Sequence, residues 1–283
     1  MNRLFCFGMG FCAKALAQSL APKGWSIGAT TRGPVGYQSV PFDSDLGQAL
    51  HDATHVLISA PPADEGDPVL TRHAGALSAI SPPLKWLGYL STTGVYGDHG
   101  GNWIDEATPV APTSQRAKRR VAAEQAWLKW GTAANVPIHI FRLAGIYGPG
   151  RSPIDTLRAG TARRIVKPGQ VFSRIHVDDV ATVLAASMAH PNAGRIYNVC
   201  DDEPAPPHEV VEYAASLIGV SPPPLEAFEV AAQSMSEMAL SFYAESKRVR
   251  NTRIKSELEV TLQYPSYREG LQAIYVSGFS TSA

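Results

Sequence analysis

Short apolar runs alternate with longer amphipathic runs through the first half of the chain, and this rhythm constrains the fold more than any other feature. The strand-like runs are residues 3–8, 25–31, 39–42, 55–60, 85–91 and 138–143, and the helix-like runs are residues 13–20, 46–51, 69–80 and 115–130. Strands that alternate with helices are typical of a parallel sheet with helices on its faces. The rhythm therefore predicts an α/β fold with a doubly wound parallel sheet.

A glycine-containing turn joins the first expected strand to the first expected helix. It has the pattern G-x-G-x-x-A and comprises Gly8, Met9, Gly10, Phe11, Cys12 and Ala13. Gly8 permits a tight turn, Gly10 lets the backbone approach a pyrophosphate, and Ala13 is small enough for close packing of helix on strand. Amides at the start of the helix supply an anion site. Because the pattern lies between a strand and a helix, it predicts a Rossmann-type dinucleotide site; the alternative is a turn that binds nothing.

The end of the second expected strand bears on the choice of cofactor. NAD enzymes commonly place an acidic residue there to bind the ribose 2′-hydroxyl, whereas this chain has Thr31 and Arg32. A guanidinium pairs with a 2′-phosphate through two hydrogen bonds, and a carboxylate would repel that group. We therefore favour NADP(H), with NAD(H) as the alternative cofactor. The competing interpretation is that Arg32 is a solvated residue at the end of a strand.

The rhythm loosens after Gly148, where proline and glycine are spread through the sequence. Residues 174–176 and 196–199 are strand-like, and residues 178–188, 208–218, 249–258 and 267–275 are helix-like. We expect residues 1–148 to form the NAD(P)-binding domain, with residues 170–200 returning to it. Residues 149–283 are expected to form mainly a smaller α/β substrate-binding lobe.

Composition excludes several classes of protein. Twenty-five basic and 25 acidic residues give no net charge, so neither nucleic acid nor an anionic membrane is an expected partner. No run approaches 18 apolar residues, and the apolar N-terminal stretch is interrupted by Lys14 and explained by the glycine turn rather than by a signal peptide. Cys6, Cys12 and Cys200 lack paired spacing, so we expect no disulfide framework, no metal site and a cytoplasmic location.

Residues 90–124 contain the most specific motif, LSTTGVYG followed by PTSQRAKRRVAAEQ. This stretch resembles the catalytic segment of the extended short-chain dehydrogenase/reductases, the NAD(P)-dependent epimerases and dehydratases. In that family a Ser or Thr three residues before Val-Tyr-Gly is followed by Tyr-x-x-x-Lys at the start of a helix. Thr92 occupies the first position, but Arg116 and Arg120 occupy the other two. Because a guanidinium cannot donate a proton near neutral pH, the segment supports the fold and argues against the usual chemistry.

The resemblance extends over nearly the whole chain, through the segments 142–150, 174–180, 196–204, 247–251 and 264–270. It is greatest to compact, atypical members that have a shortened glycine loop and no Tyr-x-x-x-Lys. It implies further cofactor contacts: Asp43 to the adenine, Ala60, Pro61 and Pro62 to the adenosine ribose, and Leu143, Ala144 and Gly145 beside the nicotinamide.

The resemblance also implies roles at the reacting centre. Thr92 remains able to hydrogen-bond a substrate oxygen, with Thr93 beside it, and Arg120 replaces Lys in holding the ribose. Arg116 is able to stabilise an oxyanion as a fixed charge. Arg174 is expected to face the cleft and bind substrate, and the alternative is a structural ion pair. The same two interpretations are open for Arg142.

Other residues are candidate acids. Tyr96 and Tyr147 lie near the expected cleft, and Tyr147 is also a candidate substrate contact, although packing is the favoured interpretation of both. His99, Asp105 and Glu106 are interpreted as turn and capping residues, and His176 with Asp178 as a link between elements. A literal Tyr-x-x-x-Lys match at Tyr243 and Lys247 lies far downstream, and we interpret it as a coincidence.

Two functions remain open. The first is an NADP(H)-binding atypical oxidoreductase, epimerase or dehydratase that acts on a small carbonyl, hydroxyl or sugar-type substrate with altered acid/base residues. The second is a sensor or scaffold that binds NADP(H) without turnover. Relatives often dimerise through the long helix that begins near Gln115, so a homodimer is also an expectation.

Overall fold

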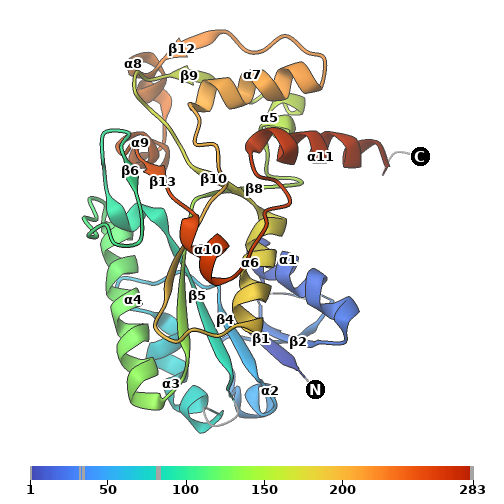
Figure 1. The fold of residues 1–283 in the computed structure, drawn as a ribbon, viewed down its shortest axis with the longest axis vertical. Coiled ribbons are helices and arrows are strands. Elements are labelled where there is room, and N and C mark those ends of the chain that lie inside the picture. Colours follow the sequence, from blue (N-terminus) through green and yellow to red (C-terminus); the bar gives the residue numbers. More distant parts are fainter. Residues whose placement is uncertain (1, 32, 34–35, 81–83, 281–283) are drawn as a thin grey trace.

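The computed structural model describes residues 2–31, 33, 36–80 and 84–280. Within these residues the chain forms a parallel sheet with helices on both faces and, above it, a group of shorter elements (Figure 1).

A seven-stranded parallel sheet in the order β11-β7-β5-β4-β1-β2-β3 dominates the described part of the chain. Its strands are β1 (Arg3–Phe7), β2 (Ser26–Thr30), β3 (Gln38–Val40), β4 (His55–Ile58), β5 (Trp86–Thr92), β7 (Ile138–Leu143) and β11 (Ile196–Val199). The chain runs outward from β1 to β3, then returns to β4 and runs outward the other way. The predicted doubly wound α/β fold is thus confirmed.

Helices bury both faces of this sheet. One face is covered by α1 (Phe11–Leu20), α6 (Val177–Ala189) and α10 (Thr252–Glu257), and the other by α2 (Gly47–Leu50), α3 (Pro68–Ile80) and α4 (Gln115–Ala134). Side chains alternate along a strand, so Leu4 and Cys6 of β1 join the first core whereas Phe5 and Phe7 join the second. Burial on both faces explains why the strand sequences read as continuous apolar runs.

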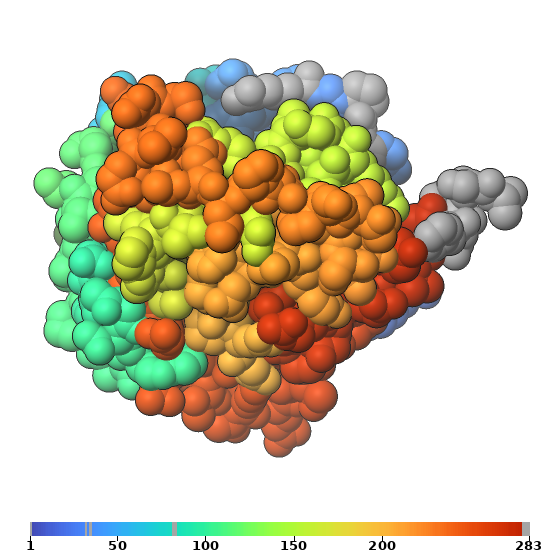
Figure 2. All heavy atoms as spheres, turned by 90° about the horizontal axis from the view of Figure 1, so that it is seen from above, coloured from blue at the N-terminus to red at the C-terminus, as the bar shows by residue number. Residues whose placement is uncertain are grey.

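The shorter elements above the sheet have a core of their own. It includes Tyr147, Ile154, Val210, Tyr267 and Leu271. The surrounding elements are α5 (Pro153–Arg158), β9 (Arg164–Val166), α7 (Pro207–Leu217), β12 (Leu225–Ala227), α8 (Phe228–Ala231), η3 (Ala232–Ser234), α9 (Glu237–Tyr243) and α11 (Tyr267–Ser280). Seen from above, segments from about residue 150 and from about residue 205 onward lie side by side on this face (Figure 2).

Two short parallel pairs connect the halves. β8 (Gly145–Tyr147) pairs with β10 (Arg174–His176), and β6 (Trp103–Ile104) pairs with β13 (Arg248–Val249). The remaining elements are two 3-10 turns, η1 (Ala21–Lys23) and η2 (Thr93–Tyr96). The pairs bring together segments that are far apart in the sequence, at the level where the strands of the main sheet end.

The helix expected over residues 249–258 is wrong in its first part. Residues 248–249 form β13, and α10 begins only at Thr252, after Asn251. The reason is tertiary: the amides of Arg248 and Arg250 donate to the carbonyls of Asn102 and Ile104, and these ladder bonds hold the segment extended.

None of the described helices is both long and apolar enough to cross a membrane.

Candidate dinucleotide and substrate site

The carboxyl ends of the parallel strands lie along one edge of the sheet. The register places Phe7 beside Thr30 and Ile58, and Thr92 beside Leu143. The segments that follow these strands therefore gather at the same edge, and the reversal of strand order between β1 and β4 leaves a crevice there. Residues 8–13, 59–62, 92–97 and 143–147 all belong to this edge.

The glycine turn has the geometry that a dinucleotide requires. Gly8 has a φ of 89°, in the left-handed region that favours glycine, and its amide donates to Thr30 Oγ1 at 3.0 Å. A Cβ at Gly8 would lie 3.5 Å from the Ala60 amide nitrogen, and one at Gly10 would lie 3.6 Å from Ser59 Oγ. Ala13 is fully buried where α1 packs on the sheet. The turn therefore leaves space above the backbone and directs helix amides into it, which fits a pyrophosphate.

The segment after β2 carries the expected 2′-phosphate contact. The Thr31 amide donates to the Val40 carbonyl at 3.1 Å, and its hydroxyl donates to the Gly33 carbonyl. Arg32 lies outside the described residues, so its role stays a prediction.

The other residues assigned to the adenosine part lie at the same edge. Asp43, after β3, is exposed and forms an ion pair with Arg72 at 3.1 Å. Ala60 follows β4, and its amide donates to the Phe7 carbonyl at 2.9 Å. Pro61 and Pro62 continue this segment at the surface. Their contacts with a cofactor remain predictions.

A cavity of about 450 Å³ opens between the sheet edge and the upper elements. It is bounded by the ends of β5 and β7, by the start of α4, and by β8, β10, α9 and α11. Among the residues predicted from sequence, Thr92, Thr93, Arg116, Leu143, Ala144, Gly145 and Tyr147 line it. Arg174 lines it as well. The structure therefore brings the predicted nicotinamide and substrate contacts together.

Thr92 is positioned with a free hydrogen to donate. Its Oγ1 accepts a hydrogen bond of 3.1 Å from the Gly94 amide, which starts the η2 turn. A hydroxyl oxygen that accepts this bond still has its own hydrogen. Because Thr92 lines the cavity, this hydrogen is available to a substrate oxygen.

Arg116 lies in the first turn of α4, at the entrance of the cavity. Its guanidinium lies over the Phe242 ring, 5.0 Å from the centroid, and no acid among the described residues forms an ion pair with it. The positive end of the α4 dipole adds to its charge. An anion or a developing oxyanion would be stabilised at this position.

Arg120 does not line the cavity. Its Nη1 donates to the Leu90 carbonyl at 2.6 Å and to the Tyr89 hydroxyl at 3.3 Å, so the side chain is held against β5. Arg120 is one helical turn after Arg116, so it lies about 6 Å farther along the α4 axis, away from the strand end. Its assignments as a catalytic residue and as a contact to the ribose both stay predictions.

Neither tyrosine predicted near the cleft presents its hydroxyl as an acid. Tyr96 is fully buried outside the cavity, and its hydroxyl donates to Asn198 Oδ1 at 2.8 Å. Tyr147 lines the cavity, but its hydroxyl donates to the Ser266 carbonyl at 3.3 Å and lies where a Cβ at Gly270 would fall. Burial raises the pKa of both phenols. Both residues therefore serve packing, and neither is retained as a candidate acid.

Arg174 is fixed at the upper end of the cavity. Its Nη1 donates to the carbonyls of Phe172 and Ala205 at 2.8 and 3.0 Å. Its Nε and Nη2 have no hydrogen-bond acceptor among the described residues. Asp201 is its main neighbouring acid and is 1% exposed. Burial raises the pKa of Asp201 to about 8, against the opposing effect of the Arg174 charge and the Glu203 amide.

Tyr243 and Lys247 have no assigned role in the sequence interpretation. Both line the cavity, although they lie about 150 residues after Thr92 in the sequence. The Lys247 ammonium donates to the Gly97 carbonyl and to Glu245 Oε2, each at 2.6 Å. The Tyr243 ring packs on Phe172 and Phe228, with centroids 5.5 and 5.2 Å away. Their literal Tyr-x-x-x-Lys spacing, interpreted above as a coincidence, is the sequence signal that bears on these two positions.

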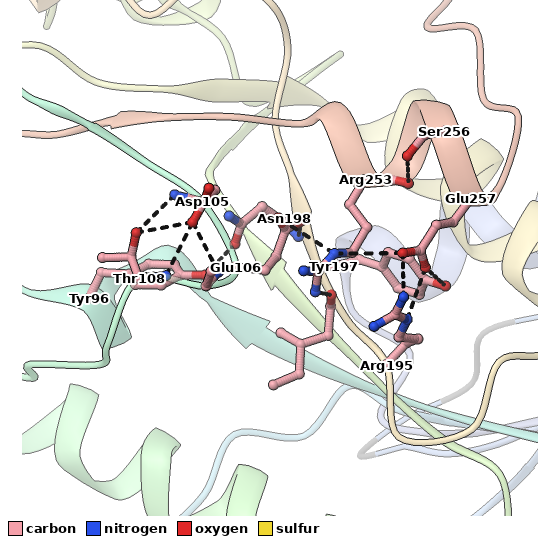
Figure 3. Close-up of polar contacts among 12 residues, drawn as sticks. Tyr96, Asp105, Glu106, Thr108, Arg195, Tyr197, Asn198, Arg253, Ser256 and Glu257 are labelled. Atoms are coloured by element: carbon pink, nitrogen blue, oxygen red, sulfur yellow. Dashed lines mark hydrogen bonds and ion pairs between the residues drawn. The ribbon is translucent and has the colours of Figure 1, made fainter.

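Buried polar contacts hold the cavity walls in place. Arg142 of β7 forms a two-pronged ion pair with Glu124 of α4, at 2.8 and 3.2 Å. Glu106 accepts from the Asn198 amide at 2.9 Å and faces Arg253, so the acidic turn is anchored to β11 and α10 (Figure 3). Asp105 accepts from two amides of its own turn, and His176 caps α6 by accepting from the Asp178 amide. These are structural roles, including that of Arg142.

Cysteine and metal chemistry find no support at this edge. Cys6, Cys12 and Cys200 are free and buried, and burial raises the pKa of Cys12 to about 11. In the part of the chain that the structure describes, no group of three or more His, Cys, Asp or Glu side chains is placed to hold a metal ion.

A Rossmann-type sheet with a glycine turn at its switch point and a cavity beside it defines a dinucleotide-binding α/β protein. Comparison with known proteins gives the family. The profile of the NAD dependent epimerase/dehydratase family matches residues 77–200. A solved structure of a conserved protein of unknown function from Silicibacter pomeroyi is 49% identical, covers 98% of this chain and 99% of that one, and superposes with a TM-score of 0.90.

Two curated relatives extend the comparison. Protein YeeZ of Escherichia coli K12 is 29% identical over 290 residues, covering 94% of this chain and 97% of YeeZ. GDP-6-deoxy-D-mannose reductase of Pseudomonas aeruginosa is 28% identical over 283 residues, covering 89% of this chain and 88% of the reductase. Residues 77–200 thus match the NAD dependent epimerase/dehydratase family, and the relatives show that the likeness extends over nearly the whole chain.

Proposed function

We propose that the protein is an NADP(H)-dependent oxidoreductase that reduces a small carbonyl compound. The observation that carries the proposal is the meeting of Thr92, Arg116 and residues 143–145 in one cavity at the carboxyl edge of the sheet. The name of the Pseudomonas aeruginosa relative, a reductase, supports this class of reaction.

The nicotinamide, when bound, supplies a hydride to the carbonyl carbon. Thr92 donates its hydroxyl hydrogen to the carbonyl oxygen and orients it. Arg116 stabilises the negative charge that develops on that oxygen, as a fixed cation. The alkoxide then takes a proton from water, and the hydroxide that is left is neutralised by a proton from the solvent, so carbonyl, hydride and one solvent proton balance to an alcohol. No side chain is asked to replace the family's tyrosine as an acid.

Cofactor preference is tested by thermal shift. NADPH should raise the melting temperature more than NADH, because Arg32 pairs with the 2′-phosphate. Arg32→Ala should abolish the difference, whereas Arg250→Ala, which removes an arginine from over the Trp103 ring on the surface, should preserve it. Equal shifts by the two cofactors in the wild type would refute the assignment to NADP(H).

Turnover is tested by following NADPH absorbance with a panel of aldehydes and ketones. Reduction that depends on Thr92 supports the proposal. The second candidate is a sensor that binds NADPH without turnover. Two observations favour it: position 116 holds an arginine, which cannot donate a proton near neutral pH, and the Arg120 side chain is held against β5. A change in NADPH fluorescence on binding, with no oxidation of NADPH by any member of the panel, would favour the sensor.

A further inference from the structure

The lining of the cavity differs from what a polyhydroxylated substrate requires. Its upper walls are formed by apolar side chains, including Ile146, Val171, Phe172, Val210, Phe242 and Leu271. No Asn, Gln, Asp or His side chain is among the described lining residues. Sugar hydroxyls are recognised by such groups, and burying hydroxyls without partners costs binding energy. The lining instead suits a compact apolar or aromatic body.

The charges in the cavity do not cancel. Glu245 is its only lining acid in the described part of the chain, and it is engaged by Lys247 at 2.6 Å and by the Thr113 hydroxyl at 2.7 Å. Arg116 and Arg174 therefore contribute charges that no lining acid neutralises. Asp201, the main acid near Arg174, is buried, and its raised pKa leaves it largely protonated at neutral pH.

The position of Arg174 defines where an anion would bind. Two backbone carbonyls hold one side of the guanidinium, and the Phe172 ring lies beneath it, 5.9 Å from the centroid. The two remaining donor atoms form one edge of a planar fork, which matches a carboxylate. Arg116, in the first turn of α4, lines the same cavity as Thr92.

We propose that the substrate is a small organic acid with an apolar or aromatic body, whose carboxylate pairs with Arg174 while its reacting carbonyl lies between Thr92 and Arg116. This assignment rests on the proposed function, because it uses the same cavity. It makes Arg174 the residue that selects acids over neutral compounds and over nucleotide sugars.

The test is calorimetric titration of the full chain, with and without NADPH, using 3-phenylpropionate, the isosteric neutral 3-phenylpropionamide, and UDP-glucose. The acid should bind roughly 10-fold or more tightly than the amide, because the charged pair is lost in the amide. Equal affinity for acid and amide, or tighter binding of UDP-glucose than of the acid, would overturn the proposal. NADPH binding without acid preference defeats only this inference, whereas failure to bind NADPH defeats the proposed function.

Variants test whether Arg174 is the residue that gives the preference for the acid over the amide. Arg174→Gln should abolish the preference for the acid, and an undiminished preference would overturn the role of Arg174. Arg174 also donates to the Phe172 and Ala205 carbonyls, so its replacement could disturb the structure. A second variant therefore keeps Arg174. Ser241→Asp, on α9, adds a negative charge to the cavity lining and should weaken acid binding several-fold. Ser216→Asp is the matched control, since both hydroxyls donate to the carbonyl three residues earlier at 2.7 Å and Ser216 does not line the cavity. Equal affinities for the acid in the two aspartate variants would contradict the proposal.

Discussion

In the proposed reaction, the Thr92 hydroxyl is the group assigned to orient the substrate oxygen. Thr92→Ala should lower kcat/KM for NADPH-dependent reduction by about 10²–10³-fold, because the carbonyl loses its donor. Thr92→Ser keeps the donor and should remain within about 10-fold of the wild type. Steady-state kinetics on the best substrate of the panel checks both.

A structural effect must be separated from this one, because Thr92 also caps the η2 turn. Loss of a cap costs about 1 kcal/mol, and both melting temperature and NADPH affinity report it. A Thr92→Ala variant that is folded, binds NADPH and is as active as the wild type would remove Thr92 from the mechanism.

At single positions, the success of sequence interpretation depended on local geometry. Thr92 ends a strand and Arg116 starts a helix, so both are placed by elements that the sequence reveals. Tyr96 lies in a 3-10 turn, where the alternation of strand side chains does not apply, and packing was inferred from its residue type rather than from its position. Tyr243 and Lys247 reach the cavity only through the β13–β6 pairing, a contact between segments about 145 residues apart that no local pattern encodes.

The contact between α4 and β7 depends on a buried ion pair, Glu124 with Arg142, to which Ser91 also donates. Glu124→Gln should lower the free energy of unfolding by about 3–5 kcal/mol, because Arg142 is left buried without its counter-charge. Urea denaturation measures the loss. The control is Glu226→Gln: its pair with Arg163 is also two-pronged but more exposed, so the expected loss of stability is much smaller than that of Glu124→Gln. Similar costs for the two variants would contradict this account.

The same helix approaches β7 through a glycine. A Cβ at Gly131 would lie 2.1 Å from Ile138 Cγ1, so Gly131→Ala should destabilise the protein by about 1–3 kcal/mol through overpacking. Gly75 is also helical, in α3, but a Cβ there meets nothing within 4 Å, and Gly75→Ala should stabilise by about 0.5–1 kcal/mol. Thermal and urea unfolding of the two variants should therefore change in opposite directions, and a shift of the same sign in both would refute the packing argument.

Elements with a continuous apolar run or a clear period were predictable, whereas most strands of two or three residues outside the main sheet were not. All seven strands of the main sheet were expected within about two residues, because continuous apolar runs identify buried strands. β6, β8, β9, β12 and β13 have two or three residues each, too few to show alternation. α5 had a readable signal, the capping box between Ser152 and Asp155, that we did not use.

The pH dependence of the whole molecule should be dominated near neutrality by Asp201. Burial raises its folded-state pKa to about 8 from 3.8, so the folded chain holds a proton that the unfolded chain has released. The stabilisation that this proton contributes is fully present below the pKa of Asp201 in the unfolded chain. It is lost as the pH rises through the pKa of Asp201 in the folded chain. Between about pH 6.5 and 9 the free energy of unfolding should fall by about 2 kcal/mol.

Asp201→Asn replaces the carboxyl with a neutral group of similar shape and removes this dependence. The variant should show little loss of stability between pH 6.5 and 9, and its advantage over the wild type should grow with pH. Urea unfolding across this range measures the difference. Parallel pH profiles for variant and wild type would show that Asp201 is not the responsible group.

The last strand of the main sheet has a consequence for biosynthesis. β11 pairs with β7 at Ile196 and Ile140, so the segment from residue 144 to 195 must leave the ribosome before this edge of the sheet is covered. At about 5–20 residues per second, that delay lasts several seconds. During it the nascent chain exposes the apolar, unpaired edge of β7, which makes this interval the period when the protein is most dependent on chaperones.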